Sequence, residues 1–479
     1  MLTLLRQQPR PFFMIFMLEI WERFGFYTVQ GILVLYFVRS IGMSNQEAYE
    51  IFGTFSALIY VSTPLGGYLG DRLIGTKRTL VIGLIVLAVG YGVLALQVAH
   101  TLYYALGLIC IGSALFKANP SVLLANCYRK FPEQLHSGFT LYYMSINIGA
   151  LASLLLGPYV SSRFGYGYAY ALSVLGIGLG LLNFWWQRDL MRQIKTDTDN
   201  YTMSCLYWIL LIVLIGGAVA LAAYLLRHTA LAQFSISAVI TGFLVCYFVY
   251  MFKADKHLRS RMLLALILMG EAIIFFTLYQ QMPTSINLFA VNHVYPTLLG
   301  MTMDPQSFQV LNPFWIIVLS IPVAGVYHLG QQHKIHVAVP YKFAMGMVCC
   351  SIGFMILFFT RFGHDAAGMV SPWWLVGSYL FQSLGEILVS ALGVAMVAEL
   401  VPPQIMGFVM GMWFLTSSLA GFTGAAVASL TALPKGSEGG IASLMTYTHV
   451  FAQIGVTTFL AACMMALLAP VLTRLMNDN

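Results

Sequence analysis

Six ionisable residues stand inside long apolar segments of this 479-residue chain, where a charge is costly. They are four acids and two bases: Glu19, Glu22, Arg23, Lys117, Glu271 and Glu386. Each costs at least about 2.5–3.5 kcal/mol on membrane-insertion scales, so a function is the default expectation. The acids and bases can partly neutralise one another. The same set can hold a proton and a charged solute.

Three of the six residues lie close together in the sequence. Glu19, Glu22 and Arg23 stand at positions i, i+3 and i+4, which share one face of a helix. Arg23 can pair with Glu19 one turn back, which leaves Glu22 to find another cation or to bind a proton. Lys117 is the other buried base. The alternative is a static ion pair between helices, although buried pairs are weak evidence for stability.

The C-terminal half carries Glu386 in the run Gln-Ser-Leu-Gly-Glu, with no basic residue in the same segment. A lone carboxylate there suits a cationic group of a substrate. The alternative is a neutral acid that hydrogen-bonds to a neighbouring helix. Glu271 lies near the end of its segment, so snorkelling or helix pairing competes with a functional role.

Polar and aromatic residues interrupt one apolar segment at 279–285, where Pro283 removes a backbone donor. Broken helices of this kind often border cavities in transporters. Residues 70–75 have the glycine spacing of a phosphate loop, but Thr76 stands where that loop needs lysine, so nucleotide binding is rejected. The cysteines and histidines fit no strong metal-ligand motif. We therefore expect no metal and no cofactor besides the proton.

The composition indicates the class of protein that holds these residues. Hydrophobic residues make up 59% of the chain and charged residues 9%, and the mean hydropathy is +0.82. A soluble fold needs more polar surface than this, which excludes a soluble enzyme, a disordered chain and a nucleic-acid module. The long continuous apolar runs disfavour a β-barrel. The sequence predicts an all-α polytopic membrane protein.

Long helices must position the candidate residues, since a membrane span needs about 20 apolar residues. The sequence predicts fourteen spans: 12–38, 51–69, 79–98, 103–125, 138–160, 166–186, 204–226, 232–252, 262–290, 308–329, 342–360, 373–397, 404–430 and 448–473. Spans seven and eight sit between two charged loops, and removing them leaves six before and six after. This 6+6 plan with an inserted hairpin is typical of secondary transporters. The predicted domains are 1–190, 191–261 and 262–479.

The loop charges predict the orientation. With the N-terminus in the cytoplasm, 17 of the 24 Lys and Arg residues fall in cytoplasmic loops and five fall outside. This asymmetry is the expected positive-inside pattern, and an even number of spans places both termini in the cytoplasm. The net charge of +7 therefore reports cytoplasmic loops and needs no nucleic-acid partner.

Several segments together resemble one family. The run Glu19 to Phe24 resembles the ExxER signature of the proton-dependent oligopeptide transporter (POT/PTR) family, a branch of the major facilitator superfamily. The loop 66–78 resembles the loop of that superfamily. The lysine segment 115–120, the run 139–149 and the acidic run 382–386 resemble the family's fourth, fifth and tenth core helices. The likeness runs essentially the whole length and is closest to the bacterial dipeptide and tripeptide permeases, whose Gln-Met-Pro-Thr-Ser run recurs at 281–285.

The resemblance implies a proton-coupled symporter of di- and tripeptides in the bacterial inner membrane, with no enzyme activity and a monomer as the working unit. It implies that Arg23, Tyr27 and Lys117 meet the peptide carboxylate. It implies that Asn147, Asn312 and Glu386 meet the amino terminus. It implies that Tyr60, Trp413 and Ser417 line side-chain pockets. It implies that Glu19 and Glu22 couple the proton, together with Arg23 and Lys117. The expected partners are peptides, protons and the lipid bilayer.

Two residues depart from the family pattern. Gln280 stands where many members carry an acid, and Gln30 stands where many carry an arginine. A proton-coupled carrier of nitrate or another small solute is the alternative within transport, and Glu386 argues against an anion. A membrane-embedded enzyme would need a nucleophile and base or a metal cluster at depth, which no span offers. A channel is the third alternative.

Overall fold

The computed structural model describes residues 8–129, 131, 134–194, 196, 203–332, 338–400, 406–434, 436–437 and 439–477. The chain divides into two compact units. The first holds residues 1–41 and 54–232, and the second holds residues 42–53 and 233–479. One short hairpin pairs β1 (Thr297–Leu298) with β2 (Met301–Thr302). The other regular structure of the described residues is helical.

The helices that lie in the first unit, or reach into it, run from the N-terminus to the middle of the chain. They are α2 (Arg10–Leu35), η1 (Tyr36–Ile41), α3 (Asn45–Tyr68), η2 (Leu69–Leu73), α4 (Thr76–Ala95), η3 (Ala99–Thr101), α5 (Leu102–Lys117), α6 (Asn119–Cys127), α7 (Leu135–Phe164), α8 (Tyr166–Trp186), α9 (Arg188–Gln193) and α10 (Cys205–Arg227).

The second unit holds the remaining helices. They are α11 (Thr229–Lys253), α12 (Lys256–Tyr279), α13 (Ser285–His293), η5 (Pro305–Val310), α14 (Leu311–Gln332), α15 (Val339–Phe359), η6 (Thr360–Phe362), α16 (Trp373–Leu400), α17 (Met406–Ser429) and α18 (Gly440–Asn477).

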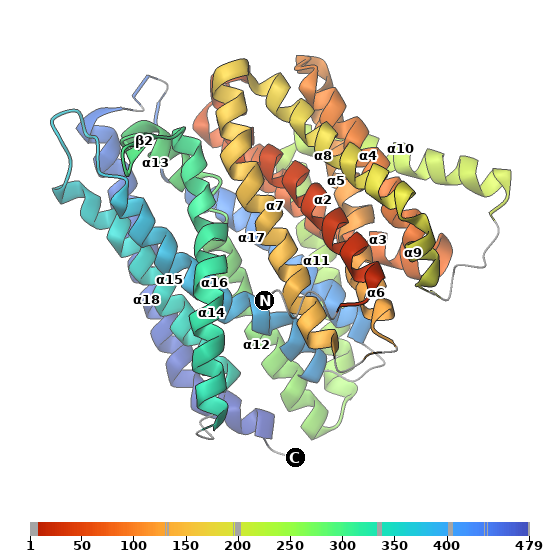
Figure 1. The fold of residues 1–479 in the computed structure, drawn as a ribbon. Coiled ribbons are helices and arrows are strands. Elements are labelled where there is room, and N and C mark those ends of the chain that lie inside the picture. The colour runs from red at the N-terminus through yellow and green to blue at the C-terminus, as the bar shows by residue number, and fades with distance from the viewer. Residues whose placement is uncertain are drawn as a thin grey trace. The chain divides into compact units, whose positions relative to one another are not determined.

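Helix α2 is the centre of the first unit and packs against α7 and α8 (Figure 1). Gly149 of α7 allows the close approach to α2. A Cβ atom at Gly149 would lie 2.6 Å from the carbonyl oxygen of Ile20 and 2.9 Å from Cβ of Arg23. The absence of a side chain at Gly149 therefore brings α7 onto the charged face of α2.

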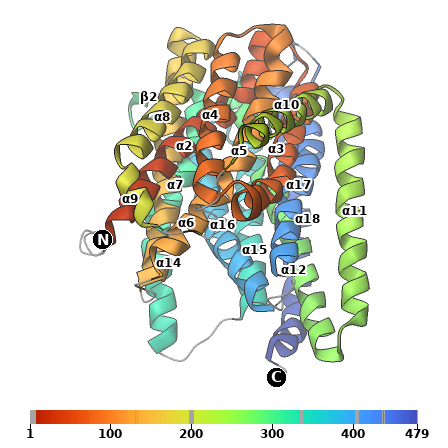
Figure 2. The same cartoon turned by 90° about the vertical axis from the view of Figure 1, so that its right-hand side faces the viewer.

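In the second unit, α15 packs against α16 and α18 (Figure 1). The Ser351 hydroxyl of α15 donates a hydrogen bond to the Gly455 carbonyl of α18 at 2.7 Å. Figure 2 shows α11 as a long helix at the border of this unit, joined to α12 by a tight turn. Asp255 caps α12 by accepting from the Leu258 N–H at 2.8 Å. The Tyr247 hydroxyl of α11 donates to the Met262 carbonyl of α12 at 2.7 Å.

Two predicted spans are interrupted near candidate residues. The predicted break at 279–285 is confirmed, since α12 ends at Tyr279 and α13 begins at Ser285. The predicted span 103–125 is confirmed as one candidate span, Ala99–Cys127, in which a turn at Ala118 separates α5, ending at Lys117, from α6, beginning at Asn119. Pro120 has no backbone N–H to donate within the helix, and the Asn119 side chain donates to the Leu115 carbonyl at 2.6 Å.

The helices make this chain a multi-pass membrane protein. Within the part that the structure describes, 12 helices are long and apolar enough to cross a membrane. They cover 12 of the predicted segments. The segments 51–69 and 373–397 also fall on helices, α3 and α16, which the same criterion leaves out.

The close packing of α7 on α2 predicts the effect of a substitution. Gly149→Ala should lower the free energy of unfolding by about 1–3 kcal/mol, because the added methyl meets the α2 backbone. The measurement is thermal unfolding in detergent. Gly178→Ala is the matched control, because a Cβ at this glycine of α8 has nothing within 4 Å. A Gly149→Ala protein that melts no lower than the control would contradict the packing.

Candidate functional site

The charged face of α2 is buried. Nε of Arg23 lies 3.1 Å from Oε1 of Glu19, and Nη2 of Arg23 lies 2.5 Å from Oε2 of Glu22. The side chains of Glu19, Glu22 and Arg23 are 3%, 0% and 5% exposed. The sequence reasoning paired Arg23 with Glu19 alone. In the structure one guanidinium serves both acids.

The two acids differ in their other contacts. Oε2 of Glu19 accepts a hydrogen bond of 2.8 Å from the Tyr142 hydroxyl of α7. Oε1 of Glu22 is buried and has no hydrogen-bond partner among the described residues. A carboxylate oxygen without a donor in such an interior favours the neutral acid over the anion. Glu22 is therefore the member of the cluster that can take up a proton.

Lys117 ends α5 and makes a different set of contacts. Its Nζ lies 4.0 Å from the ring centroid of Tyr60 and 5.4 Å from that of Phe26. The guanidinium of Arg23 lies 5.3 Å from the same Phe26 ring. Among the described residues Lys117 forms no ion pair. Aromatic faces stabilise a cation less than a carboxylate does, so the ammonium can still bind an anion.

Tyr27 and Asn147 flank this cluster. The Tyr27 ring meets the Phe26 ring edge-on at 5.5 Å, and its hydroxyl interacts electrostatically with Arg23. Asn147 of α7 is buried, and its amide donates to the Tyr143 carbonyl one turn back at 3.0 Å. The structure thus brings Arg23 and Lys117 to the Phe26 ring, with Tyr60 beside Lys117, while Asn147 bonds to its own helix.

The second unit has its own buried acid. Glu386 of α16 is 9% exposed, and its Oε2 accepts a hydrogen bond of 2.8 Å from the Asn312 amide of α14. The same amide donates to the Ser383 hydroxyl at 3.1 Å, and that hydroxyl donates to the Asn312 carbonyl at 3.3 Å. Neutral groups thus hold Glu386, and within the described residues it forms no ion pair. Such a carboxylate suits a cationic ligand.

The two remaining predicted residues lie on α17. The Trp413 ring, 5% exposed, meets the Phe276 ring of α12 edge-on at 6.3 Å. Ser417 follows one turn later and is also buried. The structure places both side chains in the interior of the second unit.

Gln281 holds the break between α12 and α13. Its amide donates to the Thr277 carbonyl at 3.1 Å and to the Gly424 carbonyl of α17 at 3.0 Å, and its Oε1 accepts from the Ser285 hydroxyl at 2.7 Å. One side chain therefore satisfies the backbone that the broken helix exposes and ties it to α17.

Comparison with known proteins identifies the family. A sequence model of the POT family matches residues 77–450. This chain belongs to the POT family. It is 46% identical over 485 residues to the dipeptide and tripeptide permease B of Photorhabdus asymbiotica, which covers 99% of this chain and 98% of that permease. It is 45% identical over 480 residues to the permease of the same name from Salmonella typhimurium, with 99% and 98% covered.

Solved structures show the same family likeness. The tetrameric transporter PepTSo2 superposes with a TM-score of 0.87 at 31% identity, over 97% of this chain and 98% of that one. A bacterial homologue of the human drug peptide transporters superposes with a TM-score of 0.83 at 30% identity, over 97% and 99%. The helices adopt the major facilitator fold of the POT transporters, and the chain is a transporter and not an enzyme.

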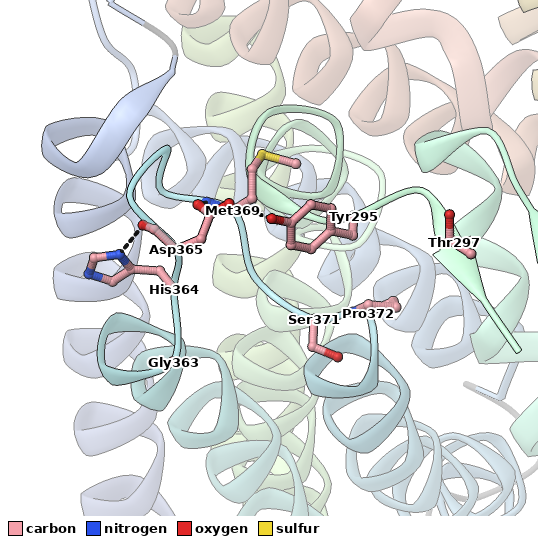
Figure 3. Close-up of a pocket in the computed structure, with 8 residues that line it drawn as sticks. All are labelled: Tyr295, Thr297, Gly363, His364, Asp365, Met369, Ser371 and Pro372. Carbon is pink, nitrogen blue, oxygen red and sulfur yellow. Dashed lines mark hydrogen bonds between the residues drawn. The ribbon is translucent and has the colours of Figure 1, made fainter. Parts of the chain in front are cut away.

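A cavity of about 600 Å³ lies beside the loop that follows α15 in the second unit (Figure 3). The Tyr295 hydroxyl donates to the Asp365 carboxylate, which also accepts from the backbone N–H groups of Ala367 and Met369. These hydrogen bonds, that of Tyr295 first, lower the pKa of Asp365. The Asp365 carboxylate is thus held by the loop that follows α15.

Three residues that make buried contacts in this POT protein are not singled out by the sequence analysis: Phe26, Ser383 and His293. Phe26 lies between two cations, which only the packing of α2 and α5 reveals. Ser383 could have been found, since it stands at i−3 from Glu386 on the same helix face. His293 at the end of α13 is fully buried, and its Nδ1–H donates to the Gly368 carbonyl at 3.1 Å while Nε2 accepts from the Ser443 hydroxyl at 2.8 Å.

His293 predicts a pH dependence of stability. Burial lowers its pKa below the ordinary value of about 6.5. Below that pH the unfolded chain binds a proton that the folded chain resists, so stability falls as the pH drops through this range. Thermal unfolding at pH 7.5 and 5.5 should therefore show a smaller acid loss in His293→Gln than in wild type. His228→Gln, at an exposed histidine, is the control, and equal acid losses in all three proteins would refute the prediction.

Proposed function

We propose that this protein is a proton-coupled symporter that imports di- and tripeptides by alternating access. The observation that carries the proposal is that the first unit holds two cations at its candidate site and the second unit holds the buried acid Glu386. In the first unit Arg23 is buried and Lys117 is half-buried, both near the Phe26 ring, and in the second unit Glu386 is buried with no ion-pair partner among the described residues. A peptide is a zwitterion, so each unit offers the charge that one end of a peptide needs. The names of the similar permeases support the same substrate class.

Each predicted residue takes one role in this proposal, except Arg23 and Lys117, which bind the peptide and also take part in proton coupling. Arg23, Tyr27 and Lys117 bind the peptide carboxylate. Asn147, Asn312 and Glu386 bind the amino terminus. Tyr60, Trp413 and Ser417 line the side-chain pockets, and Glu19 and Glu22 couple the proton. Most of these side chains are buried, Tyr27, Tyr60 and Lys117 are half-buried, and the contacts described above support the assignment.

The α2 cluster suggests how proton and peptide are linked. Arg23 shares its charge between Glu19 and Glu22. When Glu22 takes up a proton, Arg23 loses one of its two counter-charges. Its attraction for a peptide carboxylate then increases. Proton and peptide therefore bind together, and each promotes the binding of the other.

The membrane arrangement is part of the proposal. The apolar runs give fourteen spans, and the loop charges place both termini in the cytoplasm of a bacterial inner membrane. The chain organises as bundles 1–190 and 262–479 with the hairpin 191–261 between them. A monomer is the working unit in this proposal.

Uptake of labelled dialanine into proteoliposomes tests the proposal. We expect saturable accumulation with an inward proton gradient and only equilibration without one. Linear, unsaturable flux would indicate a channel and reject the proposal. Proton-driven uptake of nitrate without uptake of dialanine would establish the alternative carrier.

Glu22→Gln should abolish gradient-driven accumulation of dialanine. The amide cannot release a proton, so the coupling step is lost, while peptide exchange across the membrane needs no net proton movement. Counterflow exchange in the same vesicles is therefore the internal control and should persist in part. Accumulation at the wild-type level would remove Glu22 from the mechanism.

Glu386→Gln should weaken binding of a free-amine dipeptide by roughly ten- to a hundredfold, because it removes one charge-assisted contact. The N-acetylated dipeptide lacks the ammonium, so it should bind poorly to wild type and lose little further. Binding in detergent measures both. Glu271→Gln is the matched control, since Glu271 is also a buried acid of the second unit. Equal losses for both peptides in Glu386→Gln would show that Glu386 does not bind the amino terminus.

A further inference from the structure

The ring of Tyr91 on α4 reaches α2 at a glycine. A Cβ atom at Gly25 would lie 3.1 Å from Cε2 of Tyr91, the ring carbon next to the one that bears the hydroxyl. Helix α8 closes on the same point, because the Ser173 hydroxyl donates to the Gly25 carbonyl at 3.1 Å. Gly25 stands three residues after Glu22, on the same face of α2. The missing side chain at Gly25 thus lets the phenol approach the Glu22 face.

The Tyr91 hydroxyl and Oε1 of Glu22 both lack a hydrogen-bond partner among the described residues. Tyr91 and Glu22 are 0% exposed. The hydroxyl interacts electrostatically with Glu22 more than with Arg23. Buried polar groups are nearly always paired, so two unpaired groups around one helix turn call for an explanation.

We propose that Tyr91 is the hydrogen-bond partner of Glu22 during proton coupling and sets the pH at which the transporter works. This inference rests on the proposed role of Glu22 as the proton carrier. A phenol hydroxyl can donate and accept. When Glu22 is neutral, its O–H donates to the Tyr91 oxygen. When Glu22 releases that proton, the Tyr91 O–H donates to the carboxylate. Tyr91 keeps its own proton throughout and acts as a positioning residue.

Other titratable groups also lie around Glu22. They are Arg23, Glu19 with its donor Tyr142, and Lys117. Helices α6, α8 and α9 also pack against α2. Their groups Cys127, Tyr170 and the exposed pair Asp189–Arg192 show no interaction with Glu22 among the described contacts. Tyr91 is therefore the neutral donor on this side of Glu22.

Tyr91→Phe should move the pH midpoint of proton-driven dialanine uptake upward. The substitution removes a charge-assisted hydrogen bond from ionised Glu22 and a neutral one from protonated Glu22. The charge-assisted bond is roughly twice as strong, so the ionised form loses more and the midpoint should rise by about half to one pH unit. Infrared difference spectra against pH follow the carboxyl directly, and the band lost in Glu22→Gln assigns the Glu22 signal.

Tyr170→Phe is the matched control. Tyr170 is also fully buried, and its hydroxyl has no partner among the described residues, but its neighbours are Tyr36 and Tyr166 and not an acid. Its removal should leave the uptake midpoint and the Glu22 band at wild-type values. An unshifted Tyr91→Phe, or an equal shift in both variants, would overturn the proposal.

A second replacement keeps the ring and changes only the donor strength. Fluorotyrosine at position 91 is a stronger donor, so the midpoint should fall, opposite to the phenylalanine variant. A shift in the same direction as Tyr91→Phe would count against a hydrogen bond to Glu22. The wild-type protein separates the two ideas. If wild-type dialanine uptake does not depend on the proton gradient, the proposed function fails. If wild type is proton-driven and Tyr91 has no effect on its midpoint, only this inference fails.

Discussion

A buried guanidinium held by two buried carboxylates is the interaction on which the first unit depends. Arg23 cannot give up its proton, and in a low-dielectric interior an unpaired charge is strongly destabilising. Its contacts with Glu19 and Glu22 must therefore persist or be replaced. That need constrains α7, because Tyr142 has to reach Glu19 and Gly149 has to admit the α2 backbone. The close packing of α2 with α7 follows from this requirement.

Lys117 and Glu386, unlike Arg23, form no ion pair among the described residues. Lys117 rests on aromatic faces, and Glu386 accepts from the Asn312 amide, a neutral group. Both arrangements stabilise a charge less than an ion pair would, so a charged ligand can still gain by binding. A carrier needs this intermediate strength, because it must release what it has bound. The POT-family likeness and the buried charges thus support the same function.

Interrupted helices stand next to the candidate residues in both units. Helix α5 ends at Lys117 beside Asn119 and Pro120, and α12 ends just before Gln280 and Pro283. Each break frees backbone groups that cannot remain unpaired at membrane depth. Side chains satisfy them: Asn119 binds the Leu115 carbonyl, and Gln281 binds two carbonyls and a hydroxyl. The breaks are therefore specific structures with defined partners.

Much of this could be read from the sequence because helix periodicity and hydropathy are local properties. They predicted the apolar helices, the shared face of Glu19 and Arg23, the break at Pro283 and the lone Glu386. The contacts between helices could not be read in this way. Asn312 with Glu386, Phe26 between two cations and Tyr91 at Gly25 depend on the rotation and depth of each helix. Close packing at small residues such as glycine fixes the rotation and the depth of each helix. Only the tertiary structure therefore decided which side chains meet.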